Sequence, residues 1–211
     1  TGRFYLQAFS ILHEKYKLSL KDIICKHLFA VDIDEIAITI LRLKICSLLE
    51  SLDIDLIQSL EKNILCRNAL IPNSTLLSDF DNCIDLKDDF YSIQLQGGFD
   101  IVFSNPPYYL LKVNKEKDLH LVKHQEILQD KITKEINYFK NSNFYQHSIE
   151  GMLNYYKLSI EMIVYLTKPL GQIGVICPSS LFGDLSSTKL RRFLLMSNKL
   201  LSIRYYSEGA N

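Results

Sequence analysis

The chain has 211 residues, of which 47% are hydrophobic and 23% are charged, values that are ordinary for a globular protein with a sizeable core. Its 24 lysines and arginines balance its 24 aspartates and glutamates, so it lacks the basic excess that is typical of proteins that hold nucleic acid unaided. Five widely spaced cysteines without a C-x-x-C pair argue against a disulfide framework or a zinc site, and no apolar run reaches the roughly 18–20 residues that span a bilayer. These numbers predict a cytoplasmic α/β domain without a membrane partner or a bound metal.

Amphipathic helices alternate with short apolar strands along the chain. The pattern predicts a helix at 4–16, a strand within 27–35 that ends at Asp32, a helix at 35–49, strands at 63–70 and 99–104, a helix at 152–168, a strand at 173–178, a helix at 186–198 and a strand at 200–206. The Asp-, Asn- and Ser-rich residues 71–90 are expected to form a loop. Pro169 and Gly171 are expected to end the third helix, and Ser186 or Ser187 to cap the fourth.

This alternation predicts an α/β fold with a doubly wound, mainly parallel sheet, in which the strands of 99–104 and 173–178 are buried. In such sheets ligands bind beyond the carboxyl ends of the strands. That rule places Asp32, Asn68, Asn105–Tyr108 and Pro178 along one rim. Because the chain opens on a helix that begins with Thr1-Gly2, we expect the first strand of the sheet to lie upstream of this fragment.

The clearest chemistry lies in Asn105-Pro106-Pro107-Tyr108, directly after the apolar strand 99–104. Prolines fix φ and remove backbone donors, so this turn is stiff. The side-chain oxygen of Asn105 and the carbonyl of Pro106 then offer two acceptors at fixed spacing, which match the two hydrogens of an exocyclic amino group. Tyr108 offers a flat face on which a heterocycle can stack. The alternative is a rigid turn in which Tyr108 packs on the core, because Asn-Pro and Pro-Pro are common turn formers.

With this motif the chain resembles the S-adenosylmethionine-dependent amino methyltransferases, whose hallmark is (D/N/S)-P-P-(Y/F/W) at the end of the fourth strand. It is most similar to the N6-adenine DNA methyltransferases of the Eco57I-like, type IIG restriction–modification group. The other stretches that carry the resemblance are TGRFYLQAF, FAVDID, NILCRNALI and NYYKLSIEMIVYLTKPLGQIGVICPSSLFGD. The resemblance implies a Rossmann-like class I methyltransferase fold that lacks its first strand here. It also implies S-adenosylmethionine as cofactor and double-stranded DNA as partner, through a flipped adenine.

The resemblance also implies roles for single residues. The catalytic set is Asn105, Pro106, Pro107 and Tyr108, and the cofactor-binding set is Gly2, Asp32, Ile33, Asn68 and Asn105. Gly2 would let the backbone approach the methionine part of the cofactor, and Asp32 would accept hydrogen bonds from its ribose. Ile33 and Asn68 would contact its adenine. Two structural alternatives stay open, since Asp32 can instead cap the next helix and Asn68 can be a turn residue.

Residues 1–211 are therefore expected to form a partial catalytic domain, with residues 109–150 as an insertion after the catalytic loop and the target-recognition domain absent. The lysines of the insertion can either contact DNA or form a solvated helix face. The expected reaction is methyl transfer to the N6 amino group of adenine in DNA, within a restriction–modification or phage-defence system, with this fragment inactive alone. Two alternatives remain, namely methylation of a protein glutamine amide or of RNA, and a methyltransferase-fold scaffold that transfers nothing.

Overall fold

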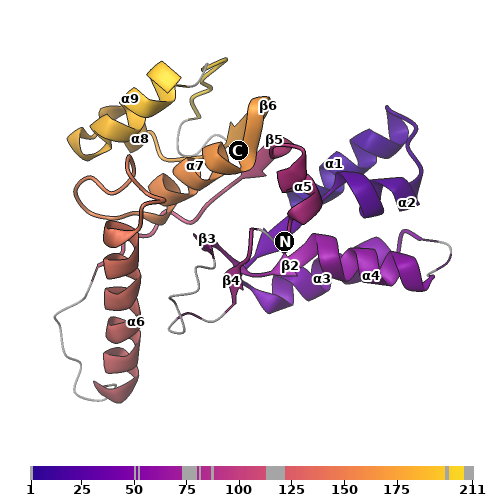
Figure 1. Cartoon of the computed structure of the whole chain (residues 1–211), viewed down its shortest axis with the longest axis horizontal. Helices are drawn as coiled ribbons and strands as arrows, with labels where there is room; N and C mark the ends of the chain where they lie inside the picture. The colour runs from indigo at the N-terminus through magenta and orange to yellow at the C-terminus, as the bar shows by residue number, and fades with distance from the viewer. Residues whose placement is uncertain are drawn as a thin grey trace. The chain divides into compact units, whose positions relative to one another are not determined.

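The computed structural model describes residues 2–49, 51, 53–72, 80, 82–86, 88–112, 122–197 and 200–206. The chain divides into two compact units, an N-terminal unit, Thr1–Gln96, and a C-terminal unit, Gly97–Asn211. Figure 1 colours the first from indigo to magenta and the second from magenta to yellow, and each unit is described by itself. Within the described ranges, no helix combines the length and the apolar character needed to cross a membrane.

The N-terminal unit packs helices against two short parallel strand pairs. Its elements are α1 (Arg3–Glu14), α2 (Leu20–Asp22), the π-helix η1 (Ile23–His27), β1 (Ala30–Asp32), α3 (Glu35–Cys46), α4 (Ile54–Asn63), β2 (Ile64–Cys66), β3 (Asn68–Pro72), β4 (Cys83–Ile84) and α5 (Tyr91–Leu95). Strand β1 pairs with β2, and β3 with β4, both in parallel. The core of this unit is aliphatic and aromatic, formed by Tyr5, Phe9, Ile23, Ile24, Ile38, Leu41, Ile45, Leu56, Leu60 and Ile64.

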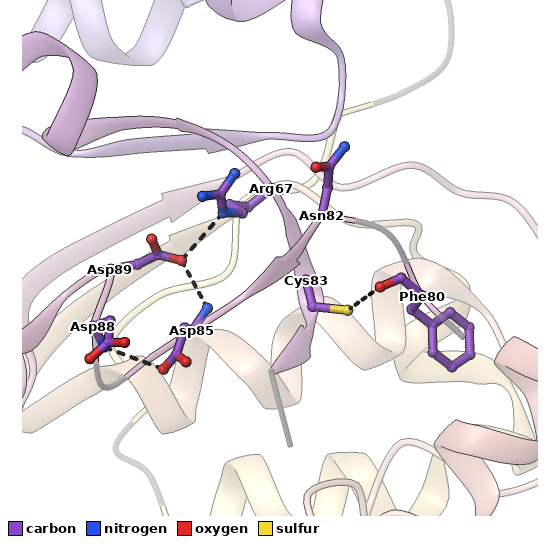
Figure 2. Close-up of a pocket in the computed structure, with 7 residues that line it drawn as sticks. All are labelled: Arg67, Phe80, Asn82, Cys83, Asp85, Asp88 and Asp89. Atoms are coloured by element: carbon purple, nitrogen blue, oxygen red, sulfur yellow. Dashed lines mark hydrogen bonds and ion pairs between the residues drawn. The ribbon is translucent and has the colours of Figure 1, made fainter. Parts of the chain in front are cut away.

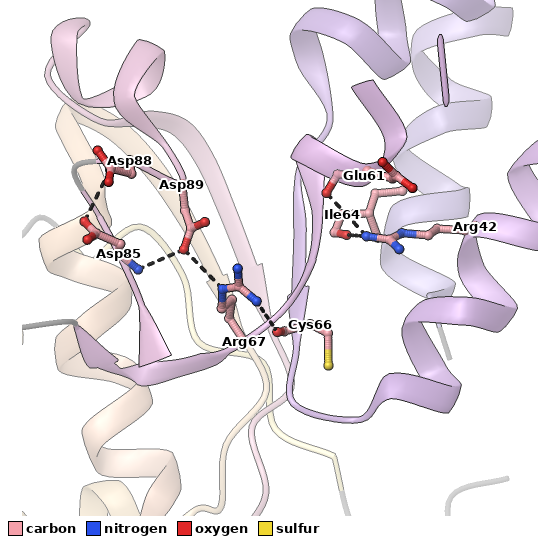
Figure 3. A network of polar contacts seen from close by, with 8 residues as sticks. All are labelled: Arg42, Glu61, Ile64, Cys66, Arg67, Asp85, Asp88 and Asp89. Atoms are coloured by element: carbon pink, nitrogen blue, oxygen red, sulfur yellow. Dashed lines mark hydrogen bonds and ion pairs between the residues drawn. The ribbon is translucent and has the colours of Figure 1, made fainter. Parts of the chain in front are cut away.

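Side-chain caps fix where the helices around β1 and β2 begin and end. The Asp34 carboxylate accepts from the N–H groups of Ile36 and Ala37 and so starts α3 directly after β1. The Arg42 guanidinium on α3 donates to the carbonyl of Ile64 at 2.5 Å, where α4 passes into β2 (Figure 3). These contacts hold α3 against β2, and the carboxyl ends of β1 and β2 lie side by side with Asp32 opposite Cys66.

The C-terminal unit is built around one parallel strand pair and a buried helix. Its elements are β5 (Phe99–Ser104), α6 (Val122–Asn141), α7 (Tyr155–Leu166), β6 (Thr167–Val175), α8 (Ser180–Gly183), the 3-10 helix η2 (Leu185–Ser187) and α9 (Thr188–Ser197). Strand β5 pairs with β6 in parallel, with Ser104 opposite Val175 at the carboxyl ends. A cluster of Tyr156, Ile160, Leu181 and Leu190 joins α7, α8 and α9.

A buried carboxylate holds the loop that precedes α7. Glu161 on α7 is 7% exposed and accepts from the N–H groups of Gln146 at 2.9 Å, His147 at 3.0 Å and Ser148 at 2.8 Å. The His147 ring stacks on Phe193 of α9, with centroids 4.2 Å apart and planes 10° apart. Three N–H donors replace the water that the carboxylate loses on burial, so this loop is fixed between α7 and α9.

The alternation of helices and parallel strands is confirmed, but one doubly wound sheet is not seen. The described residues form three two-stranded parallel sheets. The four predicted helices are confirmed as α1, α3, α7 and α9, whereas the predicted elements did not include α2, η1, α4, α5, α6, α8 or η2. The strand at 99–104 is β5, and residues 173–175 of the other predicted strand end β6, whereas residues 176–178 follow it. The prediction that both strands are buried is wrong, since Ile101 and Phe103 are more than half exposed and Ile173 is 40% exposed.

The predicted strand at 63–70 is two strands, because the chain changes partner at Arg67. Its N–H donates to the Asp32 carbonyl at 2.9 Å and ends the pairing with β1, after which Asn68 begins β3. The predicted loop at 71–90 contains β4, the partner of β3. Residues 73–79, 81 and 87 of that loop lie outside the described residues.

The expected breaks near Pro169 and Gly171 lie inside β6 rather than at a helix end. Helix α7 already ends at Leu166, and the pairing of β5 with β6 is irregular between Phe99 and Ile101. There, Leu170 takes a left-handed φ of 67°. A bulge accommodates residues that cannot join a regular ladder, so a proline can stay within the strand.

Two expectations for the last segment are wrong. The Ser187 hydroxyl is buried without a hydrogen-bond partner and the Ser186 hydroxyl accepts from Lys157, so neither caps α9. Instead the Glu150 carboxylate accepts from the N–H of Lys189 at 3.1 Å, in the first turn of α9. Residues 200–206 form no strand and are exposed, because in the described structure they pair with no other strand.

Candidate functional site

The Asn-Pro-Pro-Tyr turn leaves the sheet at the carboxyl end of β5. The N–H of Ile176 donates to the Ser104 carbonyl at 3.0 Å, which is the last contact before Asn105. Pro106 is buried, whereas Asn105, Pro107 and Tyr108 are exposed. The buried proline anchors the turn, and the amide and the phenol are left at the surface.

Both acceptors that the motif predicts are able to take a further hydrogen bond. The Tyr108 hydroxyl donates to Asn105 Oδ1 at 3.0 Å, and a carbonyl oxygen has two lone pairs. The Pro106 carbonyl accepts from no donor among the described residues. Burial, and then the nearby Cys177, raises the pKa of Tyr108, so its hydroxyl stays a donor at neutral pH.

The segment after the turn is tied to the start of α7. The N–H of Leu111 donates to the Leu153 carbonyl at 2.9 Å, and the N–H of Tyr155 donates to the Tyr109 carbonyl at 3.2 Å. The Asn154 side chain accepts from the N–H of Tyr156 and caps α7. The turn is therefore held at both ends, by β6 before it and by α7 after it.

A pocket of about 440 Å³ lies beside Tyr108 in the C-terminal unit. It is lined by Tyr108, Leu110, Met152, Asn154, Tyr156, Lys157, Pro178, Ser180, Asp184 and Ser186. The rings of Tyr108 and Tyr156 meet edge to face, with centroids 6.4 Å apart. Sequence reasoning placed Tyr108 and Pro178 here but missed the others, since no motif marks Lys157 or Ser186.

In the N-terminal unit, Asp32 ends β1, and Asn68 begins β3 two positions after β2 ends. Asp32 Oδ1 accepts from the N–H of Asp34 at 3.0 Å, and Asn68 Oδ1 accepts from the N–H of Leu70 at 3.0 Å. Since Asp34 caps α3, the alternative that Asp32 is the helix cap is wrong. The neighbouring Ile33 is 62% exposed and presents an apolar surface next to the carboxylate.

Gly2 occupies a backbone position that requires glycine. Its φ is 70°, in the left-handed region, and a Cβ at this position would lie 2.6 Å from Cδ1 of Leu41. It precedes α1, whose first hydrogen bond runs from the N–H of Leu6 to the Gly2 carbonyl at 2.9 Å. The close packing of α1 on α3 explains this glycine without a ligand.

A second pocket, of about 460 Å³, lies in the N-terminal unit and is lined by Arg67 and by residues around β4 (Figure 2). It is lined by Arg67, Phe80, Asn82, Cys83, Asp85, Asp88 and Asp89. The Asp89 carboxylate accepts from the N–H of Asp85 at 2.8 Å and pairs with the Arg67 guanidinium at 3.5 Å, as Figures 2 and 3 show. In the part of the chain that the structure describes, no three metal-ligating side chains are placed to hold an ion.

Parallel strands linked by helices, with an acidic residue at one strand end and an Asn-Pro-Pro-Tyr turn at another, are compatible with a methyltransferase fold. Residues 26–211 match the family Eco57I restriction-modification methylase, and the chain belongs to this family. The matched range contains Asp32, Asn68 and Asn105–Tyr108 but not Gly2. The family supports a DNA methyltransferase of a restriction–modification system. Comparisons with curated proteins and with solved structures give no significant match.

Proposed function

We propose that the protein transfers a methyl group from S-adenosylmethionine to the N6 amino group of adenine in DNA. The observation that carries this proposal is the turn at the end of β5, where Asn105 Oδ1 and the Pro106 carbonyl remain able to accept and Tyr108 is half exposed beside a pocket. A planar amino group needs two acceptors and a stacking surface, and the turn offers both. The family match favours DNA over RNA or a protein amide as substrate.

The residues of the turn act on the amino group by position and polarity. S-adenosylmethionine, when bound, supplies an electrophilic methyl group on a sulfonium sulfur. Asn105 Oδ1 and the Pro106 carbonyl accept the two N–H hydrogens, which draws electron density onto the nitrogen and orients its lone pair. The nitrogen held in this way would accept the methyl group that the bound cofactor supplies, and Asn105 Oδ1 and the Pro106 carbonyl would keep it in place until one N–H proton passed to water. Fixed geometry supplies much of the acceleration, so no strong base is required.

The residues at the end of β1 and β2 suit the cofactor. The second carboxylate oxygen of Asp32 has no hydrogen-bond donor within the described ranges, so it is available to the hydroxyl groups of a ribose. The exposed Ile33 side chain offers an apolar surface to a purine, and Asn68 Oδ1 retains a second lone pair for an amino group. We propose that these three residues of the N-terminal unit bind the cofactor.

The target base leaves the duplex before it reaches the turn. Extrusion costs a few kcal/mol of stacking and pairing. The half-exposed Tyr108 ring and the pocket of about 440 Å³ beside it then offer a stacking face and enough room for a base.

The test is a labelled-methyl assay with the protein expressed from its whole reading frame. DNA, RNA and a glutamine-containing protein are offered in parallel, and the DNA is digested to nucleosides. Label in N6-methyladenine that Asn105→Ala abolishes and Asn141→Ala leaves intact supports the proposal, since Asn141 is an exposed asparagine outside the turn. Label in RNA or in the glutamine amide supports the corresponding alternative. Cofactor binding without transfer to any substrate supports the scaffold.

A further inference from the structure

Lys157 is a buried cation in the wall of the pocket beside Tyr108. It lies in the first turn of α7 and is 3% exposed. Burial of an ammonium group is costly unless hydrogen bonds replace its water. An apolar residue of the same length would fill this position without that cost, so the presence of a lysine here needs a physical reason.

The contacts of Lys157 satisfy only part of its hydrogen-bonding capacity. Its Nζ donates to the Ser186 carbonyl and to the Ser186 hydroxyl, each at 2.9 Å. An ammonium group has three N–H donors, so one is left over. Among the described residues no carboxylate lies within 4.0 Å of it.

The charges around the pocket indicate which acceptor the third N–H can meet. Burial lowers the pKa of Lys157, the negative charges of Asp184 and Glu150 act against that shift, and the positive charge of Arg191 adds to it. Asp184 lines the same pocket, so its charge repels a phosphate or a carboxylate there. A neutral acceptor avoids this repulsion, and the ring nitrogens of a purine are neutral acceptors.

The turn by itself reads only an amino group. Asn105 and Pro106 offer two acceptors, which adenine, cytosine and an amide all match. A donor elsewhere in the pocket adds information, because it favours a ring with an acceptor at the facing position and disfavours one with an N–H there.

Building on the proposed function, we propose that Lys157 is a specificity-determining residue whose third N–H donates to a ring nitrogen of the adenine that enters this pocket. The buried ammonium is then satisfied only when the correct base is bound. Its contact with Ser186 holds the donor in place and links recognition to the turn before α9.

The test removes the donor and the acceptor in turn. DNA substrates carry 1-deaza-, 3-deaza- or 7-deazaadenine at the target position, and kcat/KM is measured for the wild-type protein and for Lys157→Met. We expect one analogue to lower the wild-type kcat/KM about tenfold or more, as the loss of a hydrogen bond to a charged group does. Lys157→Met should lower kcat/KM on adenine by a similar factor. For this variant, kcat/KM on that analogue should be no lower than on adenine. If, for all three analogues, the loss caused by the analogue and the loss caused by Lys157→Met multiply, the proposal is overturned.

Two further variants keep the result interpretable. Lys189→Met removes an exposed lysine of the same unit and should leave the ranking of the analogues unchanged. If Lys157→Met does not fold, Lys157→Arg takes its place, because the arginine displaces the donor. An unchanged ranking of the analogues by kcat/KM would then count against the inference. A wild-type protein that methylates no adenine in DNA overturns the proposed function and this inference together. One that methylates adenine and all three analogues equally overturns this inference alone.

Discussion

The polar groups at the strand ends are bonded differently in the two units. In the N-terminal unit, Asp32 and Asn68 each accept from a backbone N–H two positions further along the chain. In the C-terminal unit, Asn105 accepts from the side-chain hydroxyl of Tyr108, and the Pro106 carbonyl has no partner among the described residues.

The two units therefore differ in whether the hydrogen-bond partner of the polar group at the strand end can be exchanged. In the N-terminal unit the donor is a backbone N–H, which the turn itself holds in place beside each side-chain acceptor. A phenol hydroxyl moves away by rotation of its side chain, so Asn105 can exchange Tyr108 for a substrate amino group. Under the proposed function, this difference suits binding of a constant ligand in the first unit and the chemical step in the second.

The strongest test of this assignment is Asn105→Ala. Removal of one of two acceptors on the reacting nitrogen should lower kcat by about 100-fold or more, as the loss of one group that stabilises a transition state does. The affinity for cofactor should change much less. Single-turnover methyl transfer and isothermal titration with S-adenosylmethionine measure the two quantities, and an equal loss in both would remove the distinction between the units.

The stability effects of one buried and one partly buried carboxylate, Glu161 and Asp89, sharpen the comparison. Glu161→Gln places an NH2 group against the N–H donors of residues 146–148, and we expect unfolding to become easier by about 2–4 kcal/mol. Asp89→Asn in the other unit should cost about 1 kcal/mol, because Asp89 accepts from one backbone N–H and its contact to Arg67 is long, at 3.5 Å.

Urea unfolding followed by circular dichroism measures both variants. The matched control is Glu61→Gln, a change of the same chemistry at an exposed glutamate. Similar losses for Glu161→Gln and Asp89→Asn would contradict the structural role that burial gives to Glu161.

A smaller effect is expected for Asp32→Ala. Loss of its hydrogen bonds to a ribose should weaken cofactor binding by about 10-fold to 100-fold, with kcat at saturating cofactor nearly unchanged. The KM for S-adenosylmethionine measures this effect. Asp55→Ala, at an exposed carboxylate of the same unit, serves as the control. A fall in kcat at saturation would instead place Asp32 in the chemical step.

The smallest effect concerns the exposed ion pair between Lys168 on β6 and Asp100 on β5. Its hydrogen bond to Lys168 lowers the pKa of Asp100 in the folded protein, so the pair stabilises the fold above the ordinary carboxylate pKa. This contribution to stability begins to fall as the pH drops below about 4, the ordinary carboxylate pKa, and is lost as the pH passes through the lowered pKa of Asp100. Lys168→Gln should therefore lower the urea midpoint slightly at pH 7, and this effect should shrink as the pH falls below about 4. A difference that does not shrink at acidic pH would exclude the ion pair as its cause.

The sequence by itself determined the features that local rules control. Helical periodicity identified α1, α3, α7 and α9, because the side chains three and four positions apart share a helix face whatever surrounds them. The prolines at 106 and 107 predicted a stiff turn after β5, because their rings restrict φ locally. The same motif supported the resemblance to amino methyltransferases, and the family match over residues 26–211 agrees with it.

Only the tertiary structure decided which distant residues meet. Lys157 contacts Ser186 across 29 positions, and Glu161 accepts from Ser148 across 13. The switch of strand partner at Arg67 and the bulge near Pro169 likewise depend on the strands that lie alongside. A buried charge needs partners, and partners come from whichever segments the fold brings within hydrogen-bonding distance. No periodicity or short motif contains that information, so the pocket beside Tyr108 became visible only in the folded chain.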